Sequence, residues 1–292
     1  MHHYEMFGGV SPITAITLRQ AEGLRRRLAS TGLPVYVGMR NWHPFLDDTL
    51  RQMRRDGVRR VLALTLAAHH SYSSCGQYKQ NVAEALYTIR GDGYDELDVT
   101  YVGGWHAHPL FIDANARHVE AALERLPSDL QTNARVVFTA HSIPVSMAVE
   151  SRYEAELKET ARLVAERLSR NDWALVFQSR SGRPQDPWLE PDVCDYLRAE
   201  QAKGLDAVVV SPIGFVADHV EVLYDLDTEA AQVSEELGIT MTRASSVNDH
   251  PSFLDMMAEV IGTVCQRYAT GTPLPIVSPT PSPRTELPPP AR

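Results

Sequence analysis

Short apolar runs alternate with longer amphipathic segments along most of this 292-residue chain. Seven runs rich in Val, Ile and Leu predict strands, and the segments between them carry the helical spacing of apolar residues. Several runs, such as Val-Leu-Ala-Leu-Thr-Leu and Ala-Val-Val-Val, are continuous rather than alternating. A continuous run is typical of a strand that is covered on both faces of its sheet. The predicted strands are Val35–Met39, Val58–Leu66, Leu97–Gly103, Ala134–Thr139, Trp173–Gln178, Ala207–Ser211 and Ile239–Thr242.

The alternation of strand and helix indicates the α/β class, with parallel sheets flanked by helices on both faces. The seven strands could form one sheet or two, and the polar segment Arg117–Asn133 is the predicted break between two similar halves. We therefore expect an N-terminal domain over residues 1–118 and a C-terminal domain over residues 119–269. Residues 270–292 contain eight prolines and predict a disordered tail. The predicted helices are Thr14–Thr31, Pro44–Asp56, Gln77–Arg90, Ala114–Leu126, Val145–Arg170, Asp192–Lys203, His219–Glu236 and Ser252–Thr270.

Composition narrows the possible functions. The formal net charge is −9, which argues against nucleic-acid binding because such surfaces need clustered Lys and Arg. The chain has no apolar run long enough for a membrane-spanning helix, and its first residues lack the pattern of a secretory signal. Cys75, Cys194 and Cys265 show no C-x-x-C spacing. We therefore expect reduced thiols and a cytoplasmic protein, without disulfides and without a cysteine-ligated zinc or iron–sulfur site.

Chemically active side chains follow the predicted strands, where ligands bind in parallel α/β folds. His141 comes directly after one strand, and Pro144 then forces a turn. A lone histidine at a strand end is often only a hydrogen-bonded structural residue, so position alone leaves the structural and functional interpretations about even. Polar residues also follow the strands that end at Leu66 and at Gln178.

Three carboxylates follow the strand Ala207–Ser211. Glu221, Asp225 and Glu229 are spaced i, i+4 and i+8, so a regular helix places them on one face. A solvated acidic face is the simpler interpretation, but the neighbouring positions are apolar, which indicates a helix that starts near the core. A column of carboxylates that leads inward suits a divalent cation, because hard cations prefer oxygen ligands. His219 should point elsewhere on this helix and make a structural hydrogen bond.

The segment Phe7-Gly-Gly-Val-Ser-Pro12 lacks the glycine spacing and the preceding strand of a dinucleotide-binding motif. The simpler interpretation is a loop before the helix that starts at Thr14. Alternatively, Ser11 and the start of that helix hold an anionic group such as a propionate.

Four segments together resemble the ferrochelatase family, and they occur in the family's order between residue 4 and about residue 268. The last of them, which begins at Ser211, is highly specific, whereas His-Ser-Ile-Pro by itself is a weak signal. The segments are Tyr4-Glu-Met-Phe-Gly-Gly-Val-Ser-Pro-Ile, Thr139-Ala-His-Ser-Ile-Pro, Phe177-Gln-Ser-Arg-Ser-Gly with Pro187-Trp-Leu-Glu-Pro-Asp, and Ser211-Pro-Ile-Gly-Phe-Val-Ala-Asp-His-Val-Glu-Val-Leu-Tyr-Asp-Leu-Asp.

The resemblance implies two Rossmann-like, chelatase-type domains with a porphyrin in the cleft between them. It implies a lyase of haem biosynthesis that inserts Fe²⁺, its substrate, into the porphyrin with release of two protons and needs no prosthetic group. The cysteine cluster that binds a two-iron centre in some members is absent, so no iron–sulfur cluster is expected. The expected state is a monomer that contacts neighbouring haem-pathway enzymes only transiently.

The resemblance also assigns roles to residues. His141 and Glu221 match the catalytic and metal-site pair, and Asp225 and Glu229 match the outer acidic relay of metal or protons. Ser11 and Tyr78 resemble the porphyrin contacts of coproporphyrin-type bacterial enzymes, which favours coproporphyrin III over protoporphyrin IX. His141 could accept a pyrrole proton or ligate iron, because a neutral imidazole does either near neutrality.

This chain also departs from the family pattern. Family members carry several dozen residues before the Tyr-Glu-Met-Phe-Gly-Gly motif, so we expect the first strand to be missing through a misassigned start codon, or else a truncated protein. His3 replaces a common Arg, and His106 follows Trp105 where Tyr is usual. Two other functions stay open. One is a chelatase for another metal or ring, of the cobalt and sirohydrochlorin type, and the other is a non-catalytic porphyrin- or haem-binding protein.

Overall fold

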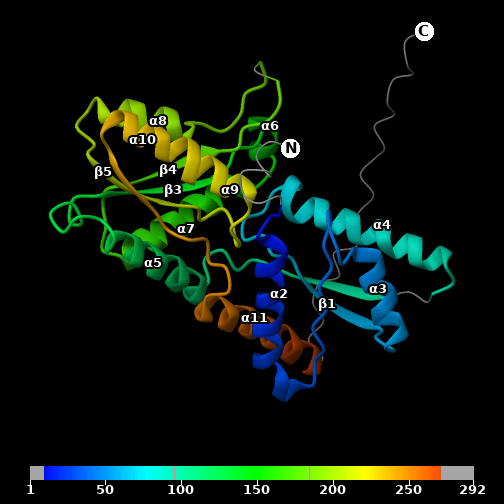
Figure 1. Ribbon diagram of the computed structural model, residues 1–292. Helices are drawn as coiled ribbons and strands as arrows, with labels where there is room; N and C mark the ends of the chain where they lie inside the picture. Colours follow the sequence, from blue (N-terminus) through cyan, green and yellow to red (C-terminus); the bar gives the residue numbers. More distant parts are fainter. Residues whose placement is uncertain (1–9, 95–96, 184, 271–292) are drawn as a thin grey trace, which may run out of the picture.

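A computed structural model describes residues 10–94, 97–183 and 185–270 (Figure 1). Within them lie two parallel sheets. The first pairs β1 (Arg60–Leu64) with β2 (Asp98–Val102), and the second has the order β4-β3-β5-β6. The second sheet consists of β3 (Arg135–His141), β4 (Trp173–Gln178), β5 (Ala207–Ser211) and β6 (Thr240–Arg243). The expected α/β class with parallel sheets flanked by helices is confirmed. Residues 1–9, which include His3 and most of the first family motif, and residues 271–292 of the expected tail lie outside the described part.

The second sheet is buried on both faces because alternate side chains of its strands enter different cores. Val136, Phe138 and Val209 pack toward α5 (Pro109–Leu123) and α7 (Tyr153–Arg167). Val137 and Val208 pack toward the opposite face, against α8 (Val193–Gln201), α9 (Val220–Tyr224) and α10 (Ala231–Leu237). The continuous apolar runs of the sequence therefore predicted this sheet correctly.

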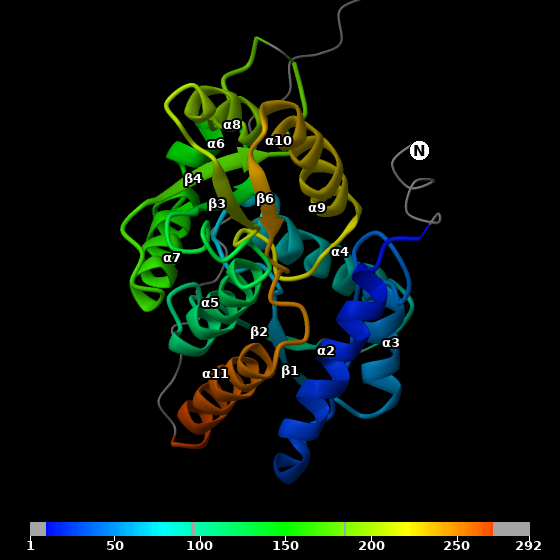
Figure 2. The ribbon, with the colours of Figure 1, turned by 60° about the vertical axis from the view of Figure 1, so that its left-hand side comes forward.

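The first sheet lies between two pairs of helices. On one face, Val61 and Val99 pack with α3 (Leu46–Arg55) and α4 (Gln77–Gly91). On the other face, Leu62 and Leu64 join the core that includes α2 (Ile13–Arg27) and α11 (Pro251–Ala269). Figure 2 shows that α11, which follows the second sheet in the sequence, lies beside α2 and the first sheet. The expected domain boundary at residue 118 stays a prediction.

The predicted strand Val35–Met39 was wrong. Its one backbone pairing among the described residues is an isolated bridge between Met39 and Phe45. The carbonyl oxygens of Val35 and Val37 accept hydrogen bonds from the side chains of Arg25 and Thr49 instead of from a strand. The segment therefore has the apolar residues of a strand without the hydrogen-bonding ladder that defines one.

Several predicted helices differ in detail from the observed ones. The predicted helix Val145–Arg170 divides into α6 (Val145–Val149) and α7, and Ser151 accepts a hydrogen bond from the first backbone amide of α7. The predicted helix His219–Glu236 is continuous, but between α9 and α10 it contains a π-helical turn, η3 (Asp225–Ala230). A second π-turn, η2 (Tyr72–Gly76), precedes α4, and a short 3₁₀ turn, η1 (Ala29–Thr31), follows α2. In the described part, no helix is both long and apolar enough to span a membrane.

Candidate active site

His141 is the last residue of β3, and hydrogen bonds on two sides hold it in place. Its Nδ1 lies 2.5 Å from the carbonyl oxygen of Ser142, and its own carbonyl oxygen accepts a hydrogen bond of 3.0 Å from the Tyr153 hydroxyl. A carbonyl oxygen only accepts hydrogen bonds, so Nδ1 carries the proton of the neutral ring. The opposite nitrogen, Nε2, therefore keeps its lone pair.

Glu221, in the first turn of α9, faces this lone pair. Its Oε2 lies 4.0 Å from His141 Nε2, and its side chain is 61% exposed. The pair is thus close enough for electrostatic attraction but beyond hydrogen-bond length, which leaves both groups available to a third species. The structure brings together the two residues that the sequence singled out as the catalytic pair.

The other two carboxylates of the predicted column have separate environments. Asp225 begins the π-turn η3 and accepts hydrogen bonds from Gln178 and Ser179 at the end of β4. Burial raises the pKa of Asp225, although both hydrogen bonds act in the opposite direction. Glu229 is exposed and interacts with Tyr224, whose pKa its charge raises. The π-turn matters because it changes the register of the helix between Glu221 and Glu229, and such turns are frequent at functional sites.

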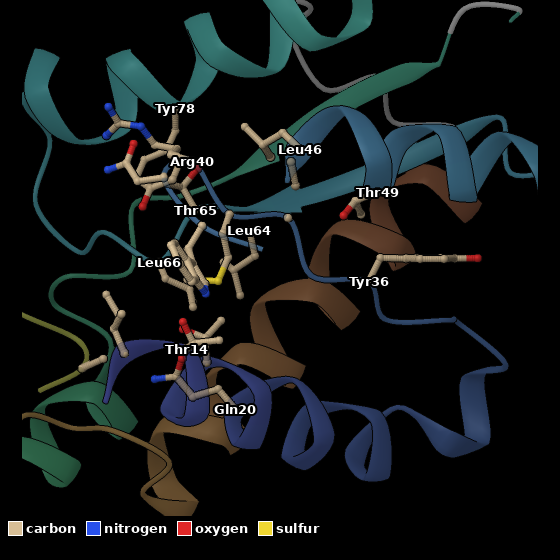
Figure 3. Close-up of a pocket in the computed structure, with 18 of the residues that line it drawn as sticks. Thr14, Gln20, Tyr36, Arg40, Leu46, Thr49, Leu64, Thr65, Leu66 and Tyr78 are labelled. Atoms are coloured by element: carbon tan, nitrogen blue, oxygen red, sulfur yellow. The ribbon is translucent and has the colours of Figure 1, made fainter. Parts of the chain in front are cut away.

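A cavity of about 960 Å³ opens beside Glu221, between α2 and β1 (Figure 3). Ser11, Tyr78 and Glu221 all line it, so the predicted porphyrin contacts and one member of the catalytic pair share one chamber. Ser11 lies just before α2 and its hydroxyl faces the amide of Ile13 at 3.4 Å. The volume falls within the usual range for small-molecule sites.

His219 also lines this cavity, contrary to the expectation that it points elsewhere. It precedes α9 in an extended conformation instead of lying within the helix, and its ring packs edge-on against Phe215. Burial lowers the pKa of His219, which favours the neutral ring.

His141 lines a second cavity of about 410 Å³, together with His69, Tyr153, Trp188 and Gly214. The two cavities lie against neighbouring residues of the segment after β1, since Leu66 lines the larger one and Ala67 the smaller one. The His141–Glu221 pair therefore has one member in each cavity, His141 in the smaller one and Glu221 in the larger one. Its position suits a reaction in which one substrate meets both side chains.

Sequence reasoning missed a polar cluster that holds the loops after β1 and β2 beside the smaller cavity. Glu156 on α7 is 2% exposed and accepts hydrogen bonds from the backbone amide of His70 (2.8 Å) and from its Nδ1 (2.9 Å). Thr160, one turn later, contacts His69 Nε2 and donates to the carbonyl oxygen of His106, each at 3.0 Å. The signal in the sequence was the histidine pair directly after a strand, but its partners lie far away along the chain.

Few potential metal ligands lie together at this site. Across residues 10–94, 97–183 and 185–270, no group of three or more His, Cys, Asp or Glu side chains is placed to hold a metal ion. His141 and Glu221 supply two donors, whereas resident zinc sites use three or four protein ligands. The three cysteines are free thiols in separate elements, and the expected absence of an iron–sulfur cluster stays a prediction.

Solved structures that resemble this chain define the class of fold. SirB from Bacillus subtilis with Fe³⁺ aligns with a TM-score of 0.62 over 87% of this chain and 91% of SirB, at 11% identity. The sirohydrochlorin chelatase SirB from Bacillus subtilis subspecies spizizenii in complex with cobalt aligns with a TM-score of 0.58 over 88% and 92% of the two chains, at 9% identity. At this low identity the likeness establishes the chelatase-type fold.

Sequence comparison gives the family. The ferrochelatase family model matches residues 1–264. The ferrochelatase of Rhodopirellula baltica is 45% identical over 276 residues, which cover 92% of this chain and 78% of the relative. The coproporphyrin III ferrochelatase of Streptomyces coelicolor is 42% identical over 276 residues, covering 89% and 74%. The chain belongs to the ferrochelatase family, which makes it an enzyme of the metal-chelatase class of lyases.

Proposed function

We propose that this chain inserts Fe²⁺ into coproporphyrin III as a step of haem biosynthesis, with His141 and Glu221 as the reacting side chains. The observation that carries the proposal is the 4.0 Å separation of His141 Nε2 and Glu221 Oε2, whose side chains line the smaller and the larger cavity. A porphyrin centre placed there meets a nitrogen lone pair and a carboxylate together.

The reaction exchanges two pyrrole N–H protons for one Fe²⁺, so the site must provide proton acceptors as well as a route for the cation. The hydrogen bond from His141 Nδ1 to Ser142 leaves Nε2 as the basic atom. Once Nε2 takes a proton, the imidazolium is stabilised by the Glu221 carboxylate at 4.0 Å. We therefore assign acceptance of one pyrrole proton to His141. Guidance of Fe²⁺ and acceptance of the second proton are assigned to Glu221, because a carboxylate attracts a divalent cation and can take up a proton.

Asp225 and Glu229 continue the carboxylate series away from His141, which supports a role in supplying Fe²⁺ or removing protons. Asp225 is tied to the end of β4 through Gln178 and Ser179, whereas Glu229 is exposed.

The choice of coproporphyrin III rests on relatives that carry that name, such as the Streptomyces coelicolor protein, and on polar groups in the large cavity. Coproporphyrin III has four propionates and protoporphyrin IX has two, so a wall with Ser11 and Tyr78 favours the more anionic ring. The free thiols support a reducing, cytoplasmic setting.

The proposal is tested by anaerobic metallation with the purified full chain, followed as the change in porphyrin absorbance on addition of Fe²⁺. We expect turnover with coproporphyrin III at a higher kcat/KM than with protoporphyrin IX. The Glu221→Gln variant should keep porphyrin binding and lose most of the rate. Faster turnover of protoporphyrin IX would overturn the choice of substrate, and wild-type rates in Glu221→Gln would overturn the assigned site.

A further inference from the structure

Arg40 stands out in the large cavity because it is the one Lys or Arg side chain among the described residues that line it. It lies in the loop between residues 39 and 46, before α3. Its guanidinium sits over the Tyr78 ring, with 4.9 Å between the guanidinium carbon and the ring centroid. Its Nε donates a hydrogen bond of 2.8 Å to Oδ1 of Asn81, one turn further along α4.

These two contacts fix the orientation of the guanidinium without neutralising its charge. Within residues 10–94, 97–183 and 185–270, no carboxylate forms an ion pair with Arg40. Arg51, on the adjacent helix, shows the contrast, since it contacts Asp47, Asp48 and Asp92. A partly buried cation that faces a cavity without an acidic partner carries a desolvation cost. An anionic ligand would offset that cost.

The geometry of the Arg40 guanidinium indicates which kind of anion it can bind. Asn81 occupies Nε, so the two terminal nitrogens, Nη1 and Nη2, remain available. They present parallel N–H donors that match the two oxygens of a carboxylate. Figure 3 shows Arg40 and Tyr78 together on one wall of the cavity, across from Thr14 and Gln20 of α2.

We propose that Arg40, oriented by Tyr78 and Asn81, binds a propionate carboxylate of the porphyrin and so favours rings that carry more propionates. The inference rests on the proposed function, because it takes the porphyrin as the ligand of this cavity. Propionates are the anionic groups of such a ring, and Arg40 lies across the cavity from the helix that follows Ser11. The carboxylates of one ring are then bound from two sides.

The test compares Arg40→Gln, Arg40→Lys and the control Arg59→Gln, which removes one positive charge from an exposed position outside the cavity. Binding of coproporphyrin III and of its tetramethyl ester is measured by fluorescence titration without iron. Arg40→Gln should raise the Kd for coproporphyrin III about 10- to 100-fold, the range for loss of charge-assisted hydrogen bonds. Arg40→Lys should recover part of this affinity. Arg59→Gln should bind coproporphyrin III as tightly as the wild type does. Ester binding should be the same in Arg40→Gln and in the wild type, and equal urea midpoints show that the variants fold.

The outcomes separate this inference from the proposed function. If the wild type neither binds coproporphyrin III nor inserts iron into it, the proposed function fails and the inference falls with it. If the wild type does both and Arg40→Gln binds the ring with unchanged affinity, only the inference is overturned. Equal weakening of acid and ester would also overturn it, because a purely structural role for Arg40 would affect both.

Discussion

Gly214 provides a sharp test of how the fold positions His141. It follows β5, and its backbone amide donates a hydrogen bond of 3.0 Å to the carbonyl oxygen of Thr139 in β3. A Cβ added at Gly214 would lie 2.5 Å from Cβ and 2.7 Å from Cα of Ala140. The obstacle is backbone and not the end of a flexible side chain, so the strand itself has to move.

The expected cost of Gly214→Ala follows from that clash. Overpacking of a well-packed interior costs about 1–3 kcal/mol, and we expect the upper half of that range because Ala140 cannot rotate out of the way. Ala140 directly precedes His141, so displacement of the strand end also changes the distance from His141 to Glu221. Since a misplacement of about 1 Å can cost about 100-fold in rate, iron insertion should fall roughly 10- to 100-fold.

The assay combines urea unfolding, followed by circular dichroism, with metallation of coproporphyrin III under conditions where the variant stays folded. Gly262→Ala is the matched control, because a Cβ at that position of α11 meets nothing within 4 Å. Replacing a glycine within a helix by alanine should stabilise the protein by about 0.5–1 kcal/mol. A Gly214→Ala variant with wild-type unfolding free energy and wild-type rate would refute the close approach of these two segments.

Three further predictions concern stability. Glu156→Ala removes a buried carboxylate and leaves the partly buried amide of His70 without its acceptor, which should cost about 1–3 kcal/mol. Glu154→Ala, which breaks an exposed pair with Lys158, should cost less than about 1 kcal/mol. Equal losses in urea unfolding would contradict the role of Glu156. Asp192→Ala removes the acceptor for the amide of Cys194 at the start of α8 and should cost about 0.5–2 kcal/mol in the same assay. Lys203 and Arg135 hold the pKa of Glu200 below its ordinary value of 4.5, so this stabilisation is complete above that value and is lost as the pH falls through the lower folded-state pKa. Glu200→Gln should therefore be less stable than the wild type near neutral pH, with a difference that shrinks in acid; a difference independent of pH would argue against the ion pairs.

Most strands of the second sheet could be predicted from sequence because burial on both faces favours a continuous run of apolar residues. Trp173–Gln178 and Ala207–Ser211 have the predicted bounds. Val35–Met39 has similar apolar residues but does not form a strand, because a strand depends on a neighbour as well as on its own residues. The helix ends were less accurate for a related reason. The start of α5 depends on Pro109 and on the side chain of His108, which caps the helix.

The candidate site was predictable where chemistry coincides with a local pattern. His141 lies at a strand end, and Glu221 lies in the helix that follows the next strand of the sheet, so both features are visible in the sequence. The π-turn at Asp225 could not be predicted, because it depends on which backbone carbonyl oxygen accepts the hydrogen bond from each amide. Arg40 contacts Tyr78, which is 38 positions away in the chain, and His70 contacts Glu156, which is 86 positions away. The periodicity of apolar residues does not predict contacts between residues so far apart in the chain.

The central claim is that His141 takes part in the chemistry of iron insertion and not merely in binding the ring. The most direct test measures His141→Ala twice, once for binding of coproporphyrin III by fluorescence and once for anaerobic insertion of Fe²⁺. A positioned proton acceptor contributes about 10²- to 10⁴-fold to a rate. We therefore expect insertion to fall by at least about 100-fold while the Kd for the porphyrin changes little. Insertion at the wild-type rate would contradict the claim.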